Sequence, residues 1–358
     1  MFVLDSHCDT PSQIYRLRDI GVEDSHAQVD FPKLRRGGVD ASFFAAYVPA
    51  SFSPDASTRY ALELIACTRD AVAANSDVAA LATSADEALS NKAAGKISIF
   101  LGLENASPVQ HNLGLLRIFH SLGVRYVTLC HSRDNEVCDS CTSGESGRWG
   151  GLSPFGRSLV KEMGRLGMLV DVSHISDRSF WDVLKYSEGP VVATHSCCRA
   201  LAAHPRNMTD EMIRALAAQG GVIQINFYPA FLDEDFAKII SGVYDKCSDI
   251  EDEFIADPSS AAKRAAWYEC LDQLKKLPRP SYKRVVDHID HAVSLVGAEH
   301  VGLGSDFDGI AVTPEGLEDC SRLGLIFDEM RARGYSEGDI ELIAGGNFLR
   351  LLNVVNRG

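Results

Sequence analysis

Side chains that bind metal ions come directly after several short apolar runs of this 358-residue chain. His7 and Asp9 follow the first run, and an extended backbone would point residues two apart to the same side. Later runs are followed in the same way by Glu104, His131, His174, His195 and Asp306. Singly, each has an ordinary structural explanation, such as a hydrogen-bonded histidine or a capping acid. Their repeated position predicts a metal site.

The types of these side chains indicate which metal they would bind. Imidazoles and carboxylates without thiolate favour zinc, with manganese, cobalt or iron as other candidates. A ligand set of three of these histidines with Asp9 and Glu104 exceeds the ligands of one tetrahedral catalytic zinc that keeps an open position. Two metal ions sharing a carboxylate fit better and suit hydrolysis by activated water. Glu104 is the expected bridge because its longer side chain can give one oxygen to each ion, and Asp306 is left as the base.

Other functional classes are disfavoured by charge and by missing motifs. The chain has 35 Lys and Arg residues against 49 Asp and Glu residues, a formal charge of −14. This acidity argues against nucleic acid or an anionic membrane as a partner. The sequence contains no H-E-x-x-H, no G-x-S-x-G, no P-loop and no G-x-G-x-x-G after a strand.

Eight short apolar runs alternate with stretches of helical periodicity, and this pattern predicts the fold. Strands are expected at residues 2–6, 39–48, 97–103, 125–129, 168–172, 191–194, 221–227 and 300–304. Helices are expected at about 57–75, 84–94, 113–122, 154–166, 177–186, 210–219, 283–296 and 320–333. The alternation predicts parallel βα units and most simply an α/β fold of the (β/α)8, or TIM barrel, type. A doubly wound open sheet is the alternative, but it would not gather the candidate residues around one axis.

The whole chain, residues 1–358, is expected to form a single barrel domain. A helical excursion is expected at about 229–282, with its main helix near 258–277, and further helices at the C-terminus. The polar segment 132–151 is expected to be a long functional loop. No signal sequence or membrane-spanning run is recognisable, so the expected location is cytoplasmic.

The ten cysteines are expected to be mostly free thiols. Cys67, Cys130 and Cys270 lie inside expected elements, where a buried free thiol is the ordinary explanation. Cys138 and Cys141 form a lone C-x-x-C, which is weak evidence for zinc or disulfide chemistry and is better explained by loop thiols.

Taken together, several motifs carry a resemblance to a known family. They are His7-x-Asp9, G-L-E-N with Glu104, D-V-S-H (171–174), T-H-S (194–196), H-P-R-N (204–207) and G-S-D-F-D-G (304–309). In order, they resemble the renal, or membrane, dipeptidase family of zinc peptidases in the amidohydrolase superfamily. The match runs from residue 5 to about 353. It implies a binuclear zinc dipeptidase that acts on dipeptides with a free amine and carboxylate and tolerates a D-residue at the C-terminal side.

The resemblance also implies two zinc ions per chain. One would be held by His7, Asp9 and Glu104, and the second by Glu104, His174 and His195. Two other readings stay open at this point. One is an amidohydrolase that acts on another small amide, such as an N-acyl amino acid. The other is a non-catalytic barrel that serves as a binding or scaffold protein.

For the substrate, the resemblance implies roles for four further side chains. His131 would contact the scissile carbonyl and the tetrahedral intermediate, and Arg206 would receive the C-terminal carboxylate. Asp306 would lie near the attacking water and the free amine, while Tyr228 would line the pocket or simply cap the core. The family's Gly-Asp-Asn run near the C-terminus is here Gly-Gly346-Asn, which puts a supporting contact in doubt. A homodimer is expected from the same resemblance.

Overall fold

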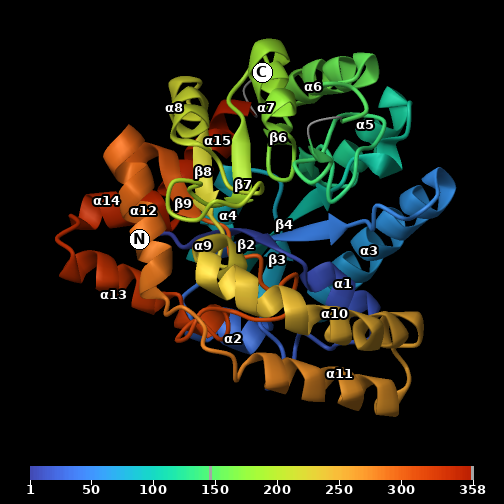
Figure 1. Ribbon diagram of the computed structural model, residues 1–358, viewed down its shortest axis with the longest axis vertical. Helices are drawn as coiled ribbons and strands as arrows, with labels where there is room; N and C mark the ends of the chain where they lie inside the picture. Colours follow the sequence, from blue (N-terminus) through green and yellow to red (C-terminus); the bar gives the residue numbers. More distant parts are fainter. Residues whose placement is uncertain (145–146, 356–358) are drawn as a thin grey trace.

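A parallel sheet wound into a nearly closed barrel lies at the centre of the molecule, with helices around it (Figure 1). The computed structural model describes residues 1–144 and 147–355. Around the barrel the strands follow the order β1 (Leu4–Cys8), β2 (Ala41–Tyr47), β4 (Ile97–Glu104), β5 (Val124–Thr128), β6 (Leu169–Asp171), β7 (Val192–Ser196), β8 (Val222–Ile225) and β9 (Val301–Leu303). The predicted (β/α)8 barrel is confirmed.

The barrel closes between its first strand and the residues that follow its last. The Asp9 N–H donates to the Phe307 carbonyl at 2.8 Å, and the Asp306 N–H donates to the His7 carbonyl at 3.0 Å. One further strand, β3 (Ala79–Leu81), was not predicted. It pairs with residues 97–99 of β4, below the point at which β5 begins to pair with that strand.

The predicted helices are confirmed to within a few residues at most ends. They are α3 (Pro54–Ala74), α4 (Ala85–Ala93), α5 (Leu113–Ser121), α6 (Pro154–Leu166), α7 (Asp177–Tyr186), α8 (Asp210–Ala218), α12 (Lys283–Val296) and α13 (Gly324–Ala332). Several begin after a Ser or Thr whose hydroxyl accepts a free backbone N–H of the first turn, as Ser153 and Thr209 do. These caps explain why the starts could be located from sequence.

Other helices escaped prediction. They are the short α1 (Thr10–Tyr15) and α2 (Phe31–Arg36). The short α9 (Pro229–Leu232) and the 23-residue α10 (Glu234–Ala256) lie in the helical excursion expected at about 229–282, in which only the helix near 258–277 had been located. Within the expected excursion, α10 packs against α11 (Ala261–Leu274), and the two lie side by side at one edge of the molecule (Figure 1). After α13 the chain forms α14 (Glu337–Glu341) and α15 (Asn347–Val355). Among the described residues, no helix is long and apolar enough to cross a bilayer.

A disulfide joins the two helices of the excursion. Cys247 of α10 and Cys270 of α11 are bonded, so the expectation of a free thiol at Cys270 is wrong. Residues 23 apart on different helices meet only because those helices pack together, which sequence spacing does not reveal. The other expected free thiols, at Cys67, Cys130, Cys138 and Cys141, are confirmed.

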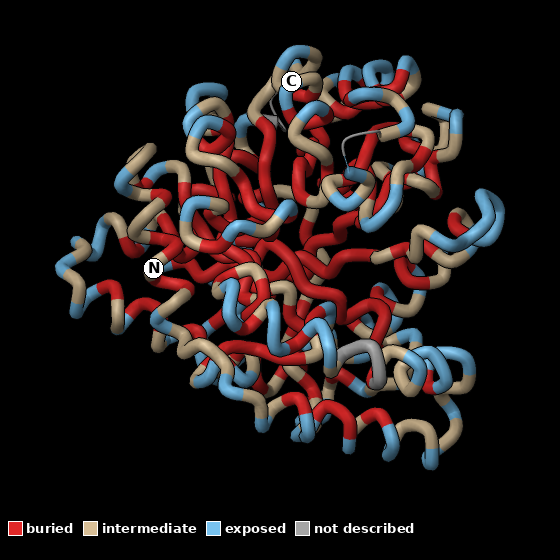
Figure 2. Tube along the Cα trace, viewed as in Figure 1, coloured by how far each residue is buried: buried red, intermediate tan, exposed pale blue. Residues whose placement is uncertain are grey.

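The barrel interior is filled by aromatic and branched side chains, and it lies in the most buried part of the chain (Figure 2). Phe43, Phe100 and Tyr126 stack across it, with Phe43 and Phe100 centroids 4.7 Å apart. Helix α15 closes the end of the barrel at which the strands begin, here called the lower end, by inserting Phe348. The Phe348 ring centroid lies 5.0 Å from that of Phe43. The upper end, at the carboxyl ends of the strands, is therefore the one left for polar residues.

Replacing Phe348 with alanine should lower the free energy of unfolding by about 3–5 kcal/mol, because it leaves a cavity in the barrel floor. Urea denaturation monitored by circular dichroism measures this change. Val354→Ala on the same helix is the control, since that side chain is 48% exposed and should change the value little. Equal effects of the two substitutions would show that α15 does not act as a plug.

Candidate metal centre

The predicted metal ligands meet at the upper end of the barrel. His7, Glu104 and His195 lie at the ends of β1, β4 and β7, while Asp9, His131, His174 and Asp306 follow β1, β5, β6 and β9. The structure thus brings these residues to one place from six strands. Among the described residues, groups able to hold a metal are His7–Asp9–Glu104, Glu104–His174–His195 and His7–His195–Asp306.

Glu104 lies between two sets of ligand atoms. Its Oε2 is 3.5 Å from His7 Nε2, and its Oε1 is 3.0 Å from His174 Nε2 and 3.5 Å from His195 Nε2. On the other side of His7, its Nε2 is 3.6 Å from Asp9 Oδ2. The two carboxylate oxygens therefore face different ligand groups, which is the arrangement that a bridging carboxylate requires.

The barrel core positions this carboxylate. Alternation along β4, which is buried throughout, turns Phe100, Gly102 and Glu104 toward the axis in turn. A Cβ at Gly102 would lie 2.3 Å from the Tyr126 ring, so only glycine leaves room for that ring. The Tyr126 hydroxyl in turn lies 2.8 Å from His7 Nδ1 and orients the imidazole.

The chain turns sharply where the strands end. His174 and Asp306 have φ angles of 71° and 63°, a left-handed conformation that side chains with a Cβ seldom adopt. Each such residue costs on the order of 1 kcal/mol and is typical of functional sites. Gly309 then allows the loop after β9 to approach the centre, since a Cβ there would lie 2.0 Å from Asp9 Oδ2.

A buried hydrogen-bond chain sets the tautomer of His195. Asp171 Oδ2 accepts the hydroxyl hydrogens of Thr128, at 2.6 Å, and Thr194, at 2.7 Å. Because Thr194 has only one hydroxyl hydrogen, its oxygen accepts from His195 Nδ1–H at 2.8 Å. Nε2 of His195 is then unprotonated and presents its lone pair, and this nitrogen lies 2.9 Å from His174 Nε2. Imidazole nitrogens so oriented suit a metal ligand pair.

The electrostatics of the centre favour a bound cation. Burial, and then the nearby Glu104 carboxylate, raises the pKa of Asp9 to about 7. Burial, followed by the positive charge of Arg206, lowers the pKa of His174, so that imidazole is neutral and can act as a ligand. Burial also lowers the pKa of His7, but Glu104 and Asp9 outweigh it and raise the value well above normal.

Unpaired buried atoms at the centre point the same way. His7 Nε2 and Asp9 Oδ1 have no hydrogen-bond partner among the described residues. Buried polar atoms are nearly always paired, so unpaired atoms of metal-binding type need an explanation. A divalent cation would pair with these atoms and relieve the repulsion among the carboxylates. The residues present therefore fit a metal centre.

The residues expected to contact substrate surround the same centre. His131 Nε2 lies 3.8 Å from Glu104 Oε1, and burial, followed by the nearby Arg206 charge, lowers the pKa of His131 to about 3. Arg206 is 6% exposed, donates one N–H to the His195 carbonyl at 3.1 Å, and has an unpaired Nε. Tyr228 is half-buried, and burial, with Asp306 nearby, raises its pKa to about 12.

Asp306 has a partner that the sequence had not indicated. Asn226, just after β8, donates from Nδ2 to Asp306 Oδ2 at 2.8 Å and holds the carboxylate in one orientation. Burial, partly offset by His7, raises the pKa of Asp306 to about 6. The motif N-F-Y-P contained the signal for Asn226, since a polar residue ends an apolar strand there. Asp171 and Thr194 belong to the motifs D-V-S-H and T-H-S, but their hydrogen bonds were not predicted. Tyr126 was missed because it lies inside an apolar strand.

Two sequence features that were left open lie outside the ligand set. Gly346 is in the tail that packs below the barrel, where the next residue, Asn347, donates to the Ala298 and Val301 carbonyls. The missing family aspartate therefore concerns packing at the lower end. Cys138 and Cys141 are in the loop 132–151, of which residues 145 and 146 lie outside the described residues.

Comparison with known proteins agrees with this geometry. A model of the membrane dipeptidase family (peptidase family M19) matches residues 1–357. The dipeptidase aclJ of Aspergillus oryzae is 33% identical over 352 residues, covering 96% of this chain and 74% of the relative. An uncharacterized dipeptidase, C965.12, of Schizosaccharomyces pombe is 33% identical over 371 residues, covering 98% of this chain and 79% of the relative.

Solved structures agree as well. The probable dipeptidase PvdM from Pseudomonas aeruginosa is 26% identical, with a TM-score of 0.82 over 100% of this chain and 96% of that one. A metallo peptidase from Rhodobacter sphaeroides is 26% identical, with a TM-score of 0.80 over 99% of both chains. That protein is liganded with a phosphinate mimic of the dipeptide L-Ala-D-Ala.

Replacing Thr194 with valine should weaken metal binding about 10- to 100-fold, because His195 Nδ1–H loses the acceptor that orients the ring. Competition with a chelator of known affinity measures this. Thr128→Val is the matched control, since Thr128 donates to the same Asp171 oxygen without contacting His195. Equal losses in both variants would mean that the effect comes through Asp171 and the fold, and not through the tautomer of His195.

Proposed function

Because the chain belongs to the membrane dipeptidase family and is a metal-dependent dipeptidase, we propose that it works with two zinc ions sharing Glu104. The observation that carries this proposal is the position of Glu104, whose Oε2 faces His7 and whose Oε1 faces His174 and His195. Asp9 completes the first set. Bound zinc would supply Lewis acidity for the scissile carbonyl and lower the pKa of the attacking water.

The residues of the chain would carry the remaining steps. Asp306, oriented by Asn226, takes the proton of the attacking water and passes it to the leaving amine. Its raised pKa of about 6 brings it closer to neutral pH, where one group can both accept and release a proton. His131 is neutral and donates an N–H to the oxygen of the tetrahedral intermediate, whose negative charge it stabilises.

Substrate length would be selected at both ends of the dipeptide. The Arg206 guanidinium keeps its Nε–H free and pairs with the C-terminal carboxylate, a group that suits its planar fork. The free amine lies beside Asp306, and Tyr228 lines the pocket. Tolerance of a D-residue at the C-terminal side is supported by the L-Ala-D-Ala mimic bound to the Rhodobacter relative.

We further propose a homodimer, on the basis of the family resemblance, and a cytoplasmic location, where the free cysteines of the described residues would stay reduced. Disulfides are rare in a reducing cytosol, so the Cys247–Cys270 bond of the structure argues against this location, and its state in cells decides the question. Sedimentation velocity tests the dimer. Thiol titration on protein quenched at lysis tests the location: ten reactive thiols after denaturation fit the cytoplasm, and eight indicate an oxidising compartment.

Metal content and substrate range measured on one sample test the proposed function. We expect about two zinc ions per chain, and a loss of both in Glu104→Gln. L-Ala-L-Ala and L-Ala-D-Ala should both be hydrolysed, whereas their N-acetyl derivatives and tripeptides should not. One zinc at full activity would contradict the binuclear centre. Faster turnover of N-acetyl amino acids than of free dipeptides would favour the alternative amidohydrolase.

Replacing Arg206 with glutamine should raise KM for L-Ala-L-Ala about 10- to 100-fold and change kcat less, because one charged hydrogen bond to the substrate is lost. A dipeptide amide, which lacks the carboxylate, should be an equally poor substrate for both proteins. Arg199→Gln is the control, since Arg199 is nearby but pairs with Asp177 at 2.7 Å. An unchanged kcat/KM in Arg206→Gln would exclude Arg206 as the carboxylate receptor.

A further inference from the structure

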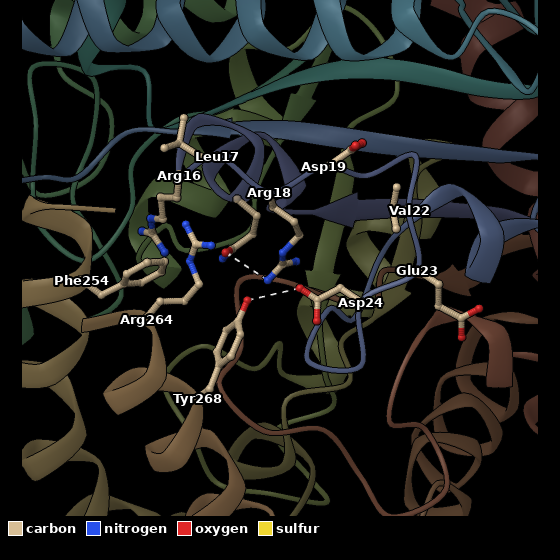
Figure 3. A pocket seen from close by; sticks show the side chains of 11 residues that line it. Arg16, Leu17, Arg18, Asp19, Val22, Glu23, Asp24, Phe254, Arg264 and Tyr268 are labelled. Carbon is tan, nitrogen blue, oxygen red and sulfur yellow. Dashed lines mark hydrogen bonds between the residues drawn. The ribbon is translucent and has the colours of Figure 1, made fainter. Parts of the chain in front are cut away.

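A cavity of about 200 Å³ lies outside the metal centre, between the segment that follows α1 and the α10–α11 pair (Figure 3). No candidate metal ligand lines it. Guanidinium groups line it from both sides: those of Arg16 and Arg18 from the segment after α1, and that of Arg264 from α11. The Phe254 and Tyr268 rings complete the wall. Three converging arginines are unusual in a chain with a net charge of −14, and they point to an anion.

The three arginines differ in how far their N–H groups are already used. Arg18 donates to Asp308 Oδ1 at 2.7 Å and to Gln13 Oε1 at 3.2 Å, so it is largely committed. Arg16 has a buried Nε with no hydrogen-bond partner among the described residues. One terminal nitrogen of Arg16 forms an ion pair with Glu251 Oε1 at 3.8 Å, which is too long for a hydrogen bond, so the N–H groups stay available to a ligand.

Arg264 also keeps N–H groups for a ligand. Among the described residues, it donates one hydrogen bond, from a terminal nitrogen to the Pro258 carbonyl at 2.8 Å. Figure 3 shows its guanidinium and that of Arg16 on the same side of the cavity, next to the Phe254 ring. An apolar ring beside two guanidinium groups lowers the local polarity and strengthens their attraction for an anion.

The acidic side chains of the cavity wall are engaged elsewhere and do not neutralise this pair. Asp19 accepts the Gly21 N–H at 2.9 Å, and Glu23 pairs with Arg36 at 2.9 Å. Asp24 accepts the His26 N–H at 2.9 Å and the Tyr268 hydroxyl at 3.3 Å. Figure 3 shows these acids on the opposite side of the cavity from Phe254.

We propose that this cavity binds a small oxyanion, a phosphate or a carboxylate, between Arg16 and Arg264. Planar guanidinium forks match the paired oxygens of both groups. The volume is several times the ~30 Å³ share of one water molecule, so it admits such an anion with its remaining waters. This site is separate from the dipeptide site and goes beyond the proposed function.

The anion would also join two parts of the structure. Arg16 immediately follows α1, which begins next to Asp9, whereas Arg264 belongs to α11, which the disulfide ties to α10. A ligand held by both arginines therefore fastens the α10–α11 pair to the barrel. Because it binds only the folded chain, it raises the melting temperature.

Calorimetric titration of the metal-loaded chain, without substrate, tests the proposal with inorganic phosphate and with acetate at constant ionic strength. We expect saturable phosphate binding that weakens about tenfold or more when Arg16→Gln and Arg264→Gln are combined, since charged hydrogen bonds are lost. Phosphate bound at the metals would persist in that variant and is thereby separated. Acetate binding with the same variant dependence extends the site to carboxylates, and its absence restricts it to phosphate.

Two further variants make the result decisive. Arg214→Gln removes an exposed arginine of α8, away from the cavity, and should leave phosphate affinity unchanged. Glu251→Gln removes the acid beside Arg16 and should tighten phosphate binding. A gain in affinity cannot result from poor folding, so this variant tests the proposal even if the double variant folds poorly. No saturable binding to the wild-type chain, or equal affinity in the wild type and the double variant, would overturn the proposal. Dipeptide turnover is measured separately, so the result at the anion site does not decide the proposed dipeptidase function.

Discussion

The structure depends on burying several carboxylates at one end of a barrel. Glu104 and Asp9 are almost fully removed from water and Asp306 is half-buried, with His7 and Arg206 as the nearest cationic groups. Buried like charges are costly unless a cation or a proton compensates them. Burial, and then the Glu104 charge, accordingly raise the pKa of Asp9 to about 7. A divalent ion removes it, so binding of the metal is part of what stabilises this end of the fold.

The apolar core of the barrel lies directly beneath the buried carboxylates and positions their neighbours. Helix α15 and the Phe43–Phe100 stack form a floor that excludes water, and Tyr126 lies above them. Tyr126 is at once the top of the apolar core and the hydrogen-bond partner of His7. Gly102 is needed for this overlap because any side chain there would collide with the ring. Core packing and ligand orientation are therefore one constraint, and a change in the floor would reach the metal centre through this ring.

The meeting of the candidate ligand residues could be predicted because each lies at or just after a strand end, where a change from apolar to polar residues is visible locally. The parallel topology then brings the ends together, whatever the loops do. Features that depend on which interior side chains meet could not be predicted, such as the contact of Tyr126 with His7. The same holds for the Cys247–Cys270 disulfide, which requires knowing how α10 and α11 pack. Strand β3 is only three residues long and has no periodicity to detect.

Metal binding and substrate binding are carried by different parts of the fold. The metal ligands stand on or next to strands, whose register fixes them. Arg206 stands on a loop, and its guanidinium lies 5.2 Å from the ring centroid of Phe231 in α9. Asn207 fastens that helix by donating to the Phe231 carbonyl at 2.8 Å. In the proposed function, a loop and an adjacent helix would therefore hold the substrate carboxylate. Since α9 opens the excursion after β8, the proposed function implies that changes in this segment would alter the preferred dipeptide without moving a candidate metal ligand.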